Sequence, residues 1–76
     1  MLKLIQTIVY NVTGKRGVTI DTDFVQDLNL NSFDIINIVS AFEDHFNTTV
    51  PTKDIWKLRR VKDVIDYLAK RGFKQP

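Results

Sequence analysis

The chain contains no cysteine. This absence excludes a disulfide framework, a thiol nucleophile and a cysteine-based metal site. The chain also lacks an apolar run near the roughly 20 residues that cross a bilayer. Its first residues are apolar at helical spacing and do not form a signal-peptide block with a small-residue cleavage site. We therefore expect a soluble, cytoplasmic protein without a membrane partner.

Other kinds of site are poorly supported. The length of 76 residues suits one domain over residues 1–76, and a domain of this size has little room for a deep active site. His45 is the only histidine, and in one helix it would lie several turns from Ser32, too far for a catalytic triad. The aspartates of "DTDFVQD" lack the Gly and Glu that an EF-hand loop needs. We expect neither an enzyme nor a metal site.

Charge is distributed unevenly along the chain, although the net charge is only +2. Residues 1–20 have three basic residues and no acid, residues 21–52 have six acids and no basic residue, and residues 53–76 have eight basic residues and three acids. Salt screens exposed charges beyond about 10 Å at 0.1 M. A partner therefore meets the local charge, which is acidic in the middle of the chain.

The basic stretch "KLRRVK" supports one alternative function, a small nucleic-acid-binding module. Its Lys and Arg residues alternate with Leu58 and Val61, which the core needs. The stretch contains no aromatic residue on which a base could stack. We therefore expect no nucleic-acid partner.

Apolar residues recur at helical spacing in three segments. The segments contain, in order, Ile5, Ile8, Val9 and Val12; Ile35, Ile38 or Val39, Phe42 and Phe46; and Val61, Val64, Ile65 and Leu68. Gly14, Asn47 and Gly72 are typical of helix ends. A single turn around Lys53–Lys57, with Thr52 as its N-cap, predicts a fourth, short helix. The pattern predicts an all-α bundle of three main helices and one short helix.

A loop of about 18 residues separates the first two helices, and loops of this length are uncommon in a compact domain unless they are functional or disordered. The apolar residues expected to anchor it to the helices are Val18, Ile20, Phe24, Leu28 and Leu30. A loop fixed in this way can hold a reactive group steady at the helix start that follows.

That helix starts at "NSFD". Asn31 is a favoured N-cap, and Asp34 is placed to accept the N-cap amide in return. Ser32 would then be the first helical residue, with a hydroxyl that faces solvent and caps nothing. Two interpretations remain open on these residues alone: an ordinary helix start in an unmodified helical interaction domain, or an attachment site.

The wider pattern favours attachment. The stretch "DLNLNSFD" is similar to a segment of a known protein family, in which an Asp-Ser-Leu tripeptide opens the second helix. The pieces "IDTDFVQDL", "FEDHF", "TVP" and "VKDVIDYL" match the same family in order and spacing, over about residues 2–71. The chain resembles the acyl carrier proteins, which are four-helix bundles with a long first loop.

The resemblance implies a carrier that catalyses nothing. A phosphopantetheinyl transferase would attach 4′-phosphopantetheine to Ser32, and the thiol of this arm would hold an acyl or aminoacyl group as a thioester for fatty-acid, polyketide or other specialised biosynthesis. Acyl ligases or synthases with basic docking faces would read the second helix of a monomeric carrier. The partner-binding residues implied are Asn31, Phe33, Asp34, Ile36, Asn37, Glu43 and Asp44.

The chain departs from the family pattern in several places. Asn31 replaces the usual Asp before the serine, Asn29 replaces a common Gly, and Arg60 stands where Thr or Ser commonly caps the last helix. The basic pI of 9.1 is also unusual. These departures indicate a specialised member. The Ser32–Phe33 pair is similar to that of some D-alanyl carrier proteins, which favours an aminoacyl or D-alanyl type.

The predicted interior bears on cargo. We expect its lining to be Ile36, Val39, Phe42, Val64, Ile65 and Leu68. Protein cores are densely packed, so a long acyl chain would have to displace side chains in order to enter. The sequence therefore predicts short or polar cargo.

Overall fold

The computed structural model describes residues 1–73, and it has four helices in this range. They are α1 (Leu2–Thr13), α2 (Ser32–Phe46), α3 (Thr52–Ile55) and α4 (Val61–Lys70). The predicted helical bundle is confirmed, including the long loop between α1 and α2. The expected start of α3 is wrong by one residue. Thr52 opens the helix, and Pro51 holds the N-cap position without a side-chain bond.

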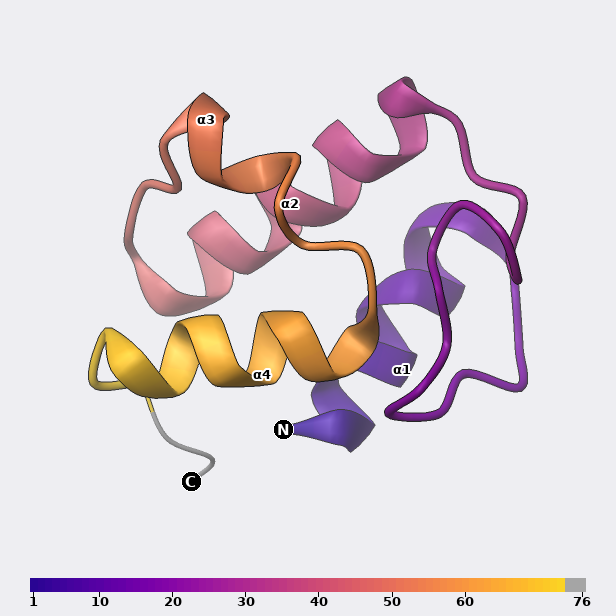
Figure 1. Cartoon of the computed structure of the whole chain (residues 1–76), viewed down its shortest axis with the longest axis horizontal. Coiled ribbons are helices and arrows are strands. Elements are labelled where there is room, and N and C mark those ends of the chain that lie inside the picture. The colour runs from indigo at the N-terminus through magenta and orange to yellow at the C-terminus, as the bar shows by residue number, and fades with distance from the viewer. Residues whose placement is uncertain (74–76) are drawn as a thin grey trace.

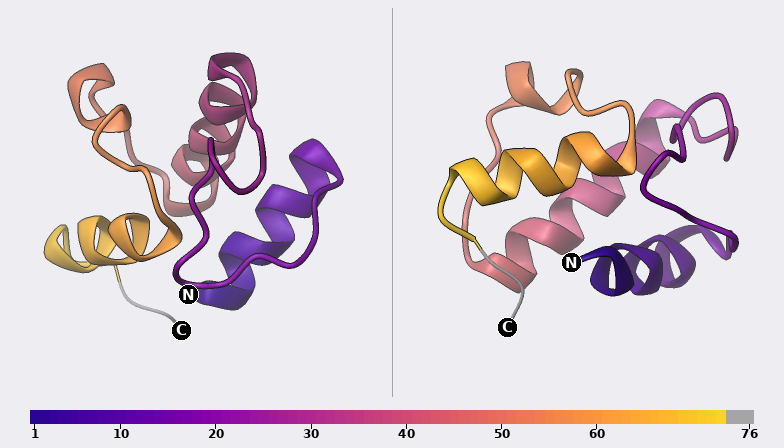
Figure 2. Two further views of the ribbon diagram at one scale, coloured as in Figure 1. Left: turned by 45° about the vertical axis from the view of Figure 1, so that its right-hand side comes forward. Right: turned by 60° about the horizontal axis from the view of Figure 1, so that its bottom comes forward.

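The helices are arranged around α2. α2 crosses the molecule, with α1 on one side of it and α3 on the other (Figures 1 and 2). α4 faces α2 from the opposite side of the interior. α1 packs against both α2 and α4. The loop of residues 14–31 passes the start of α4 before it returns to the start of α2 (Figure 1).

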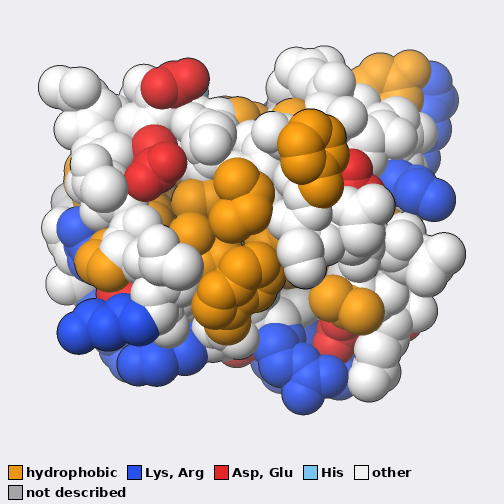
Figure 3. All heavy atoms as spheres, turned by 90° about the horizontal axis from the view of Figure 1, so that it is seen from above, with side chains coloured by type: hydrophobic (Ala, Val, Ile, Leu, Met, Phe, Trp, Pro, Cys, Tyr) orange, Lys and Arg blue, Asp and Glu red, His pale blue; other side chains and the backbone are white. Residues whose placement is uncertain are grey.

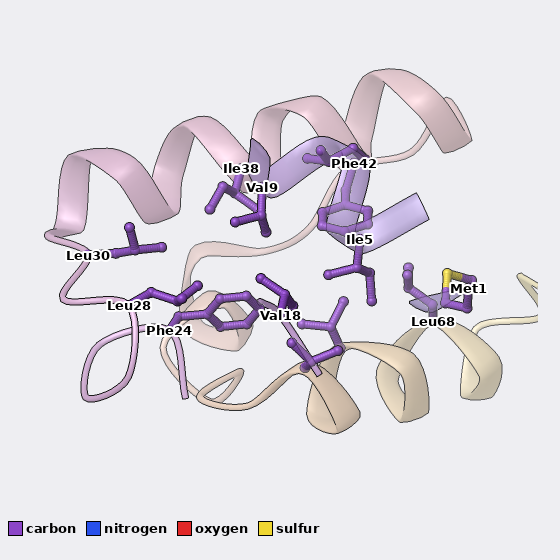
Figure 4. Packing of buried hydrophobic residues seen from close by; sticks show 13 residues of the cluster. Met1, Ile5, Val9, Val18, Phe24, Leu28, Leu30, Ile38, Phe42 and Leu68 are labelled. Atoms are coloured by element: carbon purple, nitrogen blue, oxygen red, sulfur yellow. The ribbon is translucent and has the colours of Figure 1, made fainter. Parts of the chain in front are cut away.

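One cluster of buried apolar side chains joins α1, α2, α4 and the loop. Its most deeply buried members are Ile5, Val9 and Val61. Figure 4 shows side chains from the long loop that point into the same interior as Ile38 and Phe42 of α2. The loop residues in this cluster are Val18, Phe24, Leu28 and Leu30, which confirms four of the five predicted anchors.

Ile20, the fifth predicted anchor, is 48% exposed. It lies in the turn closed by the bond from the Thr22 amide to the Thr19 carbonyl, at 3.2 Å, and a central turn position directs its side chain to solvent. Its backbone still anchors the loop, because the Lys62 amide donates to the Ile20 carbonyl at 2.9 Å.

The predicted helix ends are confirmed. Asn47 ends α2 with φ 51° and Gly14 ends α1 with φ 74°. Gly72 follows α4 with φ 87°, and the amide of Phe73 donates to the Leu68 carbonyl at 2.9 Å. This pattern is a Schellman motif, in which glycine adopts the left-handed conformation without a Cβ penalty.

Candidate functional site

Two polar residues cap the start of α2, namely Asn31 just before the helix and Asp34 in its first turn. The Asp34 amide donates to Asn31 Oδ1 at 2.8 Å, and the Asn31 amide donates to Asp34 Oδ2 at 3.4 Å. This reciprocal capping box confirms the prediction from "NSFD". It satisfies two of the amides that every helix leaves unpaired at its N-terminus.

Ser32 is consequently the first residue of α2 and is exposed. Its hydroxyl forms no hydrogen bond with any of residues 1–73. The N-terminus of a helix carries a partial positive charge that favours phosphate oxygens. An accessible hydroxyl at this end therefore fits a phosphodiester-linked group such as 4′-phosphopantetheine.

The loop before Ser32 is held by internal hydrogen bonds. Asp23 Oδ1 accepts the amides of Val25 and Gln26, each at 2.9 Å, and Asp27 Oδ2 accepts the Asp23 amide at 2.8 Å. Two carboxylates of the "DTDFVQD" segment are therefore occupied by backbone groups. These bonds fix the turn that delivers the chain to α2.

Asn29, just before the helix, has φ 54°. A left-handed backbone is where glycine is favoured and where asparagine is among the best-tolerated alternatives. The structure thus explains how Asn29 can stand where the family commonly has glycine. The next residue closes the turn, because the Leu30 amide donates to the Phe24 carbonyl at 3.1 Å.

Asp23 also connects the loop to the basic stretch before α4. It is 2% exposed, and Arg59 Nη2 lies 3.6 Å from its Oδ2. The amide of Gln26 is the main cause of a pKa below the ordinary aspartate value, and the Val25 amide and the Arg59 charge add to it against the opposing effect of burial.

The basic stretch "KLRRVK" pairs with the acidic loop. Lys62 Nζ lies 3.7 Å from Asp21 Oδ1, and Arg60 Nη1 donates to the Asp21 carbonyl at 2.8 Å. Arg60 holds the N-cap position of α4, where its amide donates to Asp63 Oδ2 at 2.9 Å. The side chains of Arg59, Arg60 and Lys62 therefore help to hold the loop that leads to Ser32, whereas Lys57 pairs with Asp54.

Two apolar residues of the predicted partner-binding surface lie on the outward side of α2. Phe33 is 72% exposed and Ile36 is 39% exposed. The placement of Ile36 in the interior is therefore wrong, because the helix turns Ile35 and Ile38 inward instead. Figure 3 shows hydrophobic side chains gathered in the middle of the face formed by α2 and α3.

The predicted acidic residues of α2 do not all point freely outward. Asp44 is exposed, whereas Asp34 is half-buried in the capping box. Glu43 is also half-buried, and its Oε2 accepts the Val50 amide at 2.8 Å. Asn37 is half-buried beside the exposed side. Sequence spacing could not reveal the Glu43 bond, because it depends on how the chain turns back after α2.

A small cavity of about 30 Å³ lies between α2, α3 and α4. Its lining is apolar side chains, namely Phe24, Ile35, Ile38, Val39, Phe42, Val50, Ile55, Leu58, Val64, Tyr67 and Leu68. By comparison, a cavity of roughly 150 Å³ can hold a benzene ring. The interior therefore has a void near α2 but no room for a long chain without rearrangement.

Tyr67, which lines the cavity, makes a contact that the sequence did not signal. Tyr67 Oη donates to Asp54 Oδ2 at 2.8 Å, which joins α4 to α3. Arg71 Nη1 donates to Tyr67 Oη at 2.7 Å, and Arg71 Nη2 donates to the Thr49 carbonyl at 3.3 Å. Burial is the main cause, and the Asp54 bond the second, of a Tyr67 pKa above the ordinary tyrosine value.

Comparison with known proteins identifies the family. Residues 3–68 match the model of the phosphopantetheine attachment site. The chain is 38% identical over 65 residues to an acyl carrier protein of Syntrophobacter fumaroxidans, which covers 83% of this chain and 80% of that protein.

The chain belongs to the acyl carrier protein family. An acyl carrier protein of Syntrophus aciditrophicus is 37% identical over 72 residues, covering 92% of this chain and 89% of that one. The fold matches the solved structure of a proposed acyl carrier protein from Mycobacterium tuberculosis, with a TM-score of 0.82, 23% identity, and 91% and 95% of the two chains covered.

The protein is thus a carrier with a covalently attached 4′-phosphopantetheine. Acyl carrier proteins work with a phosphopantetheinyl transferase and with synthases. Because the chain has no cysteine, the reactive thiol is the one that the attached arm supplies. No helix in residues 1–73 is long and apolar enough to cross a membrane.

Proposed function

We propose that Ser32 is the residue that carries the 4′-phosphopantetheine arm. The supporting observation is that the residues that cap α2 are not the residue that offers the free hydroxyl. Asn31 and Asp34 satisfy the cap, while the adjacent Ser32 hydroxyl is exposed and bonded to none of the described residues. The hydroxyl oxygen is therefore available to attack the phosphorus of coenzyme A that bears the pantetheine, within a transferase. The new P–O bond replaces the phosphoanhydride bond to 3′,5′-ADP, which leaves, and the hydroxyl proton passes to a base of the transferase.

The test is the intact mass of the protein after incubation with coenzyme A and a broad-specificity phosphopantetheinyl transferase. We expect a gain of one phosphopantetheine in the parent and none in Ser32→Ala. Ser40→Ala is the matched control, because Ser40 is also an exposed serine of α2, and it should gain the full mass. An unmodified parent, or a modified Ser32→Ala, would contradict the assignment and favour an unmodified helical interaction domain.

We propose that partner enzymes dock on the start and outward side of α2. Phe33 and Ile36 offer apolar contact beside Ser32, and the exposed Asp44 offers charge. Asn31, Asp34, Asn37 and Glu43 complete the predicted surface, with Asp34 and Glu43 also serving the fold. Acyl ligases or synthases with basic groups around an apolar pocket would fit it. We expect a monomeric, non-catalytic, cytoplasmic carrier.

Association rates test the charged part of this surface, because electrostatic steering acts on the encounter and weakens with salt. Asp34→Asn keeps an oxygen that can accept the Asn31 amide but removes the charge. We expect it to slow phosphopantetheinylation more than Lys53→Gln and Lys70→Gln combined, and added salt should slow the parent. Equal rates for all three proteins would exclude steering by Asp34.

We propose short or polar acyl or aminoacyl cargo for this carrier. The support is the small size of the cavity, about 30 Å³, because a long chain would have to displace packed side chains in order to enter. In the loaded carrier, a short cargo should leave the amide chemical shifts of Ile38, Phe42 and Leu68 near those of the arm alone. Val39→Ala, which enlarges the cavity, should increase the shifts that a long acyl chain causes. Burial of a long chain in the parent, with large shifts at these residues, would contradict the proposal.

A further inference from the structure

A second surface lies away from the start of α2. A groove of about 390 Å³ runs between α1 and the segment that follows it. The polar and aromatic residues that line it are Lys3, Gln6, Thr7, Tyr10, Lys15 and Arg16, and we call it the basic groove. Residues 1–20 include these three cations and no acid. The groove therefore presents charge of one sign.

The cations of the basic groove differ from the three cations that pair with aspartates elsewhere in residues 1–73. Elsewhere, Lys57, Arg59 and Lys62 lie within 3.8 Å, 3.6 Å and 3.7 Å of aspartate oxygens. Within residues 1–73, no ion pair involves Lys3, Lys15 or Arg16. No acidic group of the described residues pairs with them, so their charge is available to a partner.

Contacts within the groove hold two of its side chains. The Arg16 guanidinium lies 4.7 Å from the centroid of the Tyr10 ring, and its Nη2 donates to Tyr10 Oη at 3.0 Å. Gln6 Nε2 donates to the Val18 carbonyl at 2.7 Å, which ties the following segment to α1. A surface fixed in this way loses less conformational entropy on binding.

We propose that the basic groove docks an acidic segment of a partner protein. Its shape is concave, which suits a chain segment better than a flat bilayer, and anionic membranes typically recruit clusters of about 4–8 Lys or Arg residues. Tyr10 is the one aromatic residue that lines the groove, and Arg16 lies over its ring, so the groove lacks the series of aromatic side chains on which successive bases stack. Charge complementarity thus favours a polypeptide rich in Asp and Glu.

A second copy of this chain fits less well. It would have to bring its acidic residues 21–52 to the groove, and this segment contains Ser32. Such a contact would cover the segment that holds the proposed attachment site. Docking of a separate acidic partner would instead leave α2 free. The proposal does not depend on the modification of Ser32.

The experiment uses the full chain labelled with ¹⁵N and a short polyglutamate peptide, with a polyglutamine peptide as the probe control. The groove variant is Lys3→Gln/Lys15→Gln/Arg16→Gln, and the matched variant with the same change in net charge is Lys53→Gln/Lys57→Gln/Lys70→Gln. In the parent, we expect amide shifts along the exposed side of α1 and at residues 15–18. Affinity should fall about tenfold in the groove variant, because three exposed ion pairs are lost, and should stay near the parental value in the matched variant.

Several results would overturn the proposal. Equal losses in both variants would mean that net charge alone attracts the peptide. Tighter binding of a single-stranded oligonucleotide or of phosphatidylserine vesicles would assign the groove to another kind of partner. A concentration-dependent dimer that the groove variant loses would assign it to a second copy. The groove variant should still gain phosphopantetheine at the parental rate, which separates this test from that of Ser32.

Discussion

The Asp34 amide donates to Asn31 Oδ1 across 2.8 Å, and because this bond caps the helix, the Ser32 hydroxyl is not needed for capping. Asn31→Ala should therefore lower the free energy of unfolding by about 1 kcal/mol. Ser32→Ala should change it by less than about 0.5 kcal/mol, as expected for an exposed substitution. Urea unfolding of both variants measures the difference. A larger loss in Ser32→Ala than in Asn31→Ala would show that the hydroxyl supports the fold.

The local parts of this site could be predicted from the sequence because they depend on residues a few positions apart. Apolar spacing located α1, α2 and α4, and the "NSFD" segment located the capping box at Asn31 and Asp34. The free hydroxyl of Ser32 followed from the same local argument. Such features need no knowledge of how the helices pack.

Contacts between distant segments could not be predicted in this way. Asp54 and Tyr67 lie 13 positions apart and meet only because α3 packs near α4. The pairing of "KLRRVK" with the acidic loop likewise depends on the path of the loop past α4. Ile36 was misplaced for a related reason, since adjacent isoleucines at 35 and 36 leave the buried side of the helix ambiguous until its neighbours are known.

Glu43 and Asp44 are adjacent acids with different roles, which gives a second prediction. Glu43→Ala removes the acceptor of the half-buried Val50 amide and should cost about 1–2 kcal/mol in unfolding free energy. Glu43→Gln keeps an acceptor oxygen and should recover most of this loss. Asp44→Ala, at an exposed position, should leave stability within about 0.5 kcal/mol. Thermal or urea unfolding checks the order, and an equal loss at both positions would contradict it.

Asp23 should make the stability of the protein depend on pH in the acid range. Its pKa is lowered in the folded state, chiefly by the Gln26 amide, so the unfolded chain binds the proton more readily. The stabilisation is complete above the unfolded pKa and is lost as the pH falls through the folded one. Asp23→Asn should therefore be less stable than the parent near neutral pH and should lose less stability on acidification.

Urea unfolding from about pH 7 down to about pH 2 covers the range in which aspartates titrate. Asp21→Asn is the control, because Asp21 is an exposed aspartate of the same loop. It should follow the acid response of the parent closely. If Asp23→Asn and the parent lose stability in parallel, the acid response comes from other carboxylates.

Tyr67 should make the free energy of unfolding decrease at alkaline pH. Its hydroxyl donates to Asp54 and accepts from Arg71, and burial followed by the Asp54 bond raises its pKa. The neutral tyrosine stabilises the fold fully below the unfolded pKa of about 10. This contribution is lost as the pH rises through the folded pKa, because the unfolded chain releases the proton first.

Tyr67→Phe tests this decrease. It leaves the half-buried Asp54 carboxylate without its hydroxyl donor and should cost about 1 kcal/mol near neutral pH. Above about pH 10, its stability should decline less steeply than that of the parent. Tyr10→Phe is the control, because Tyr10 is the other tyrosine and is 44% exposed. Urea unfolding at neutral and alkaline pH measures both variants. A decline in Tyr67→Phe as steep as in the parent would mean that deprotonation elsewhere, and not at the contact between α3 and α4, destabilises the protein in alkali.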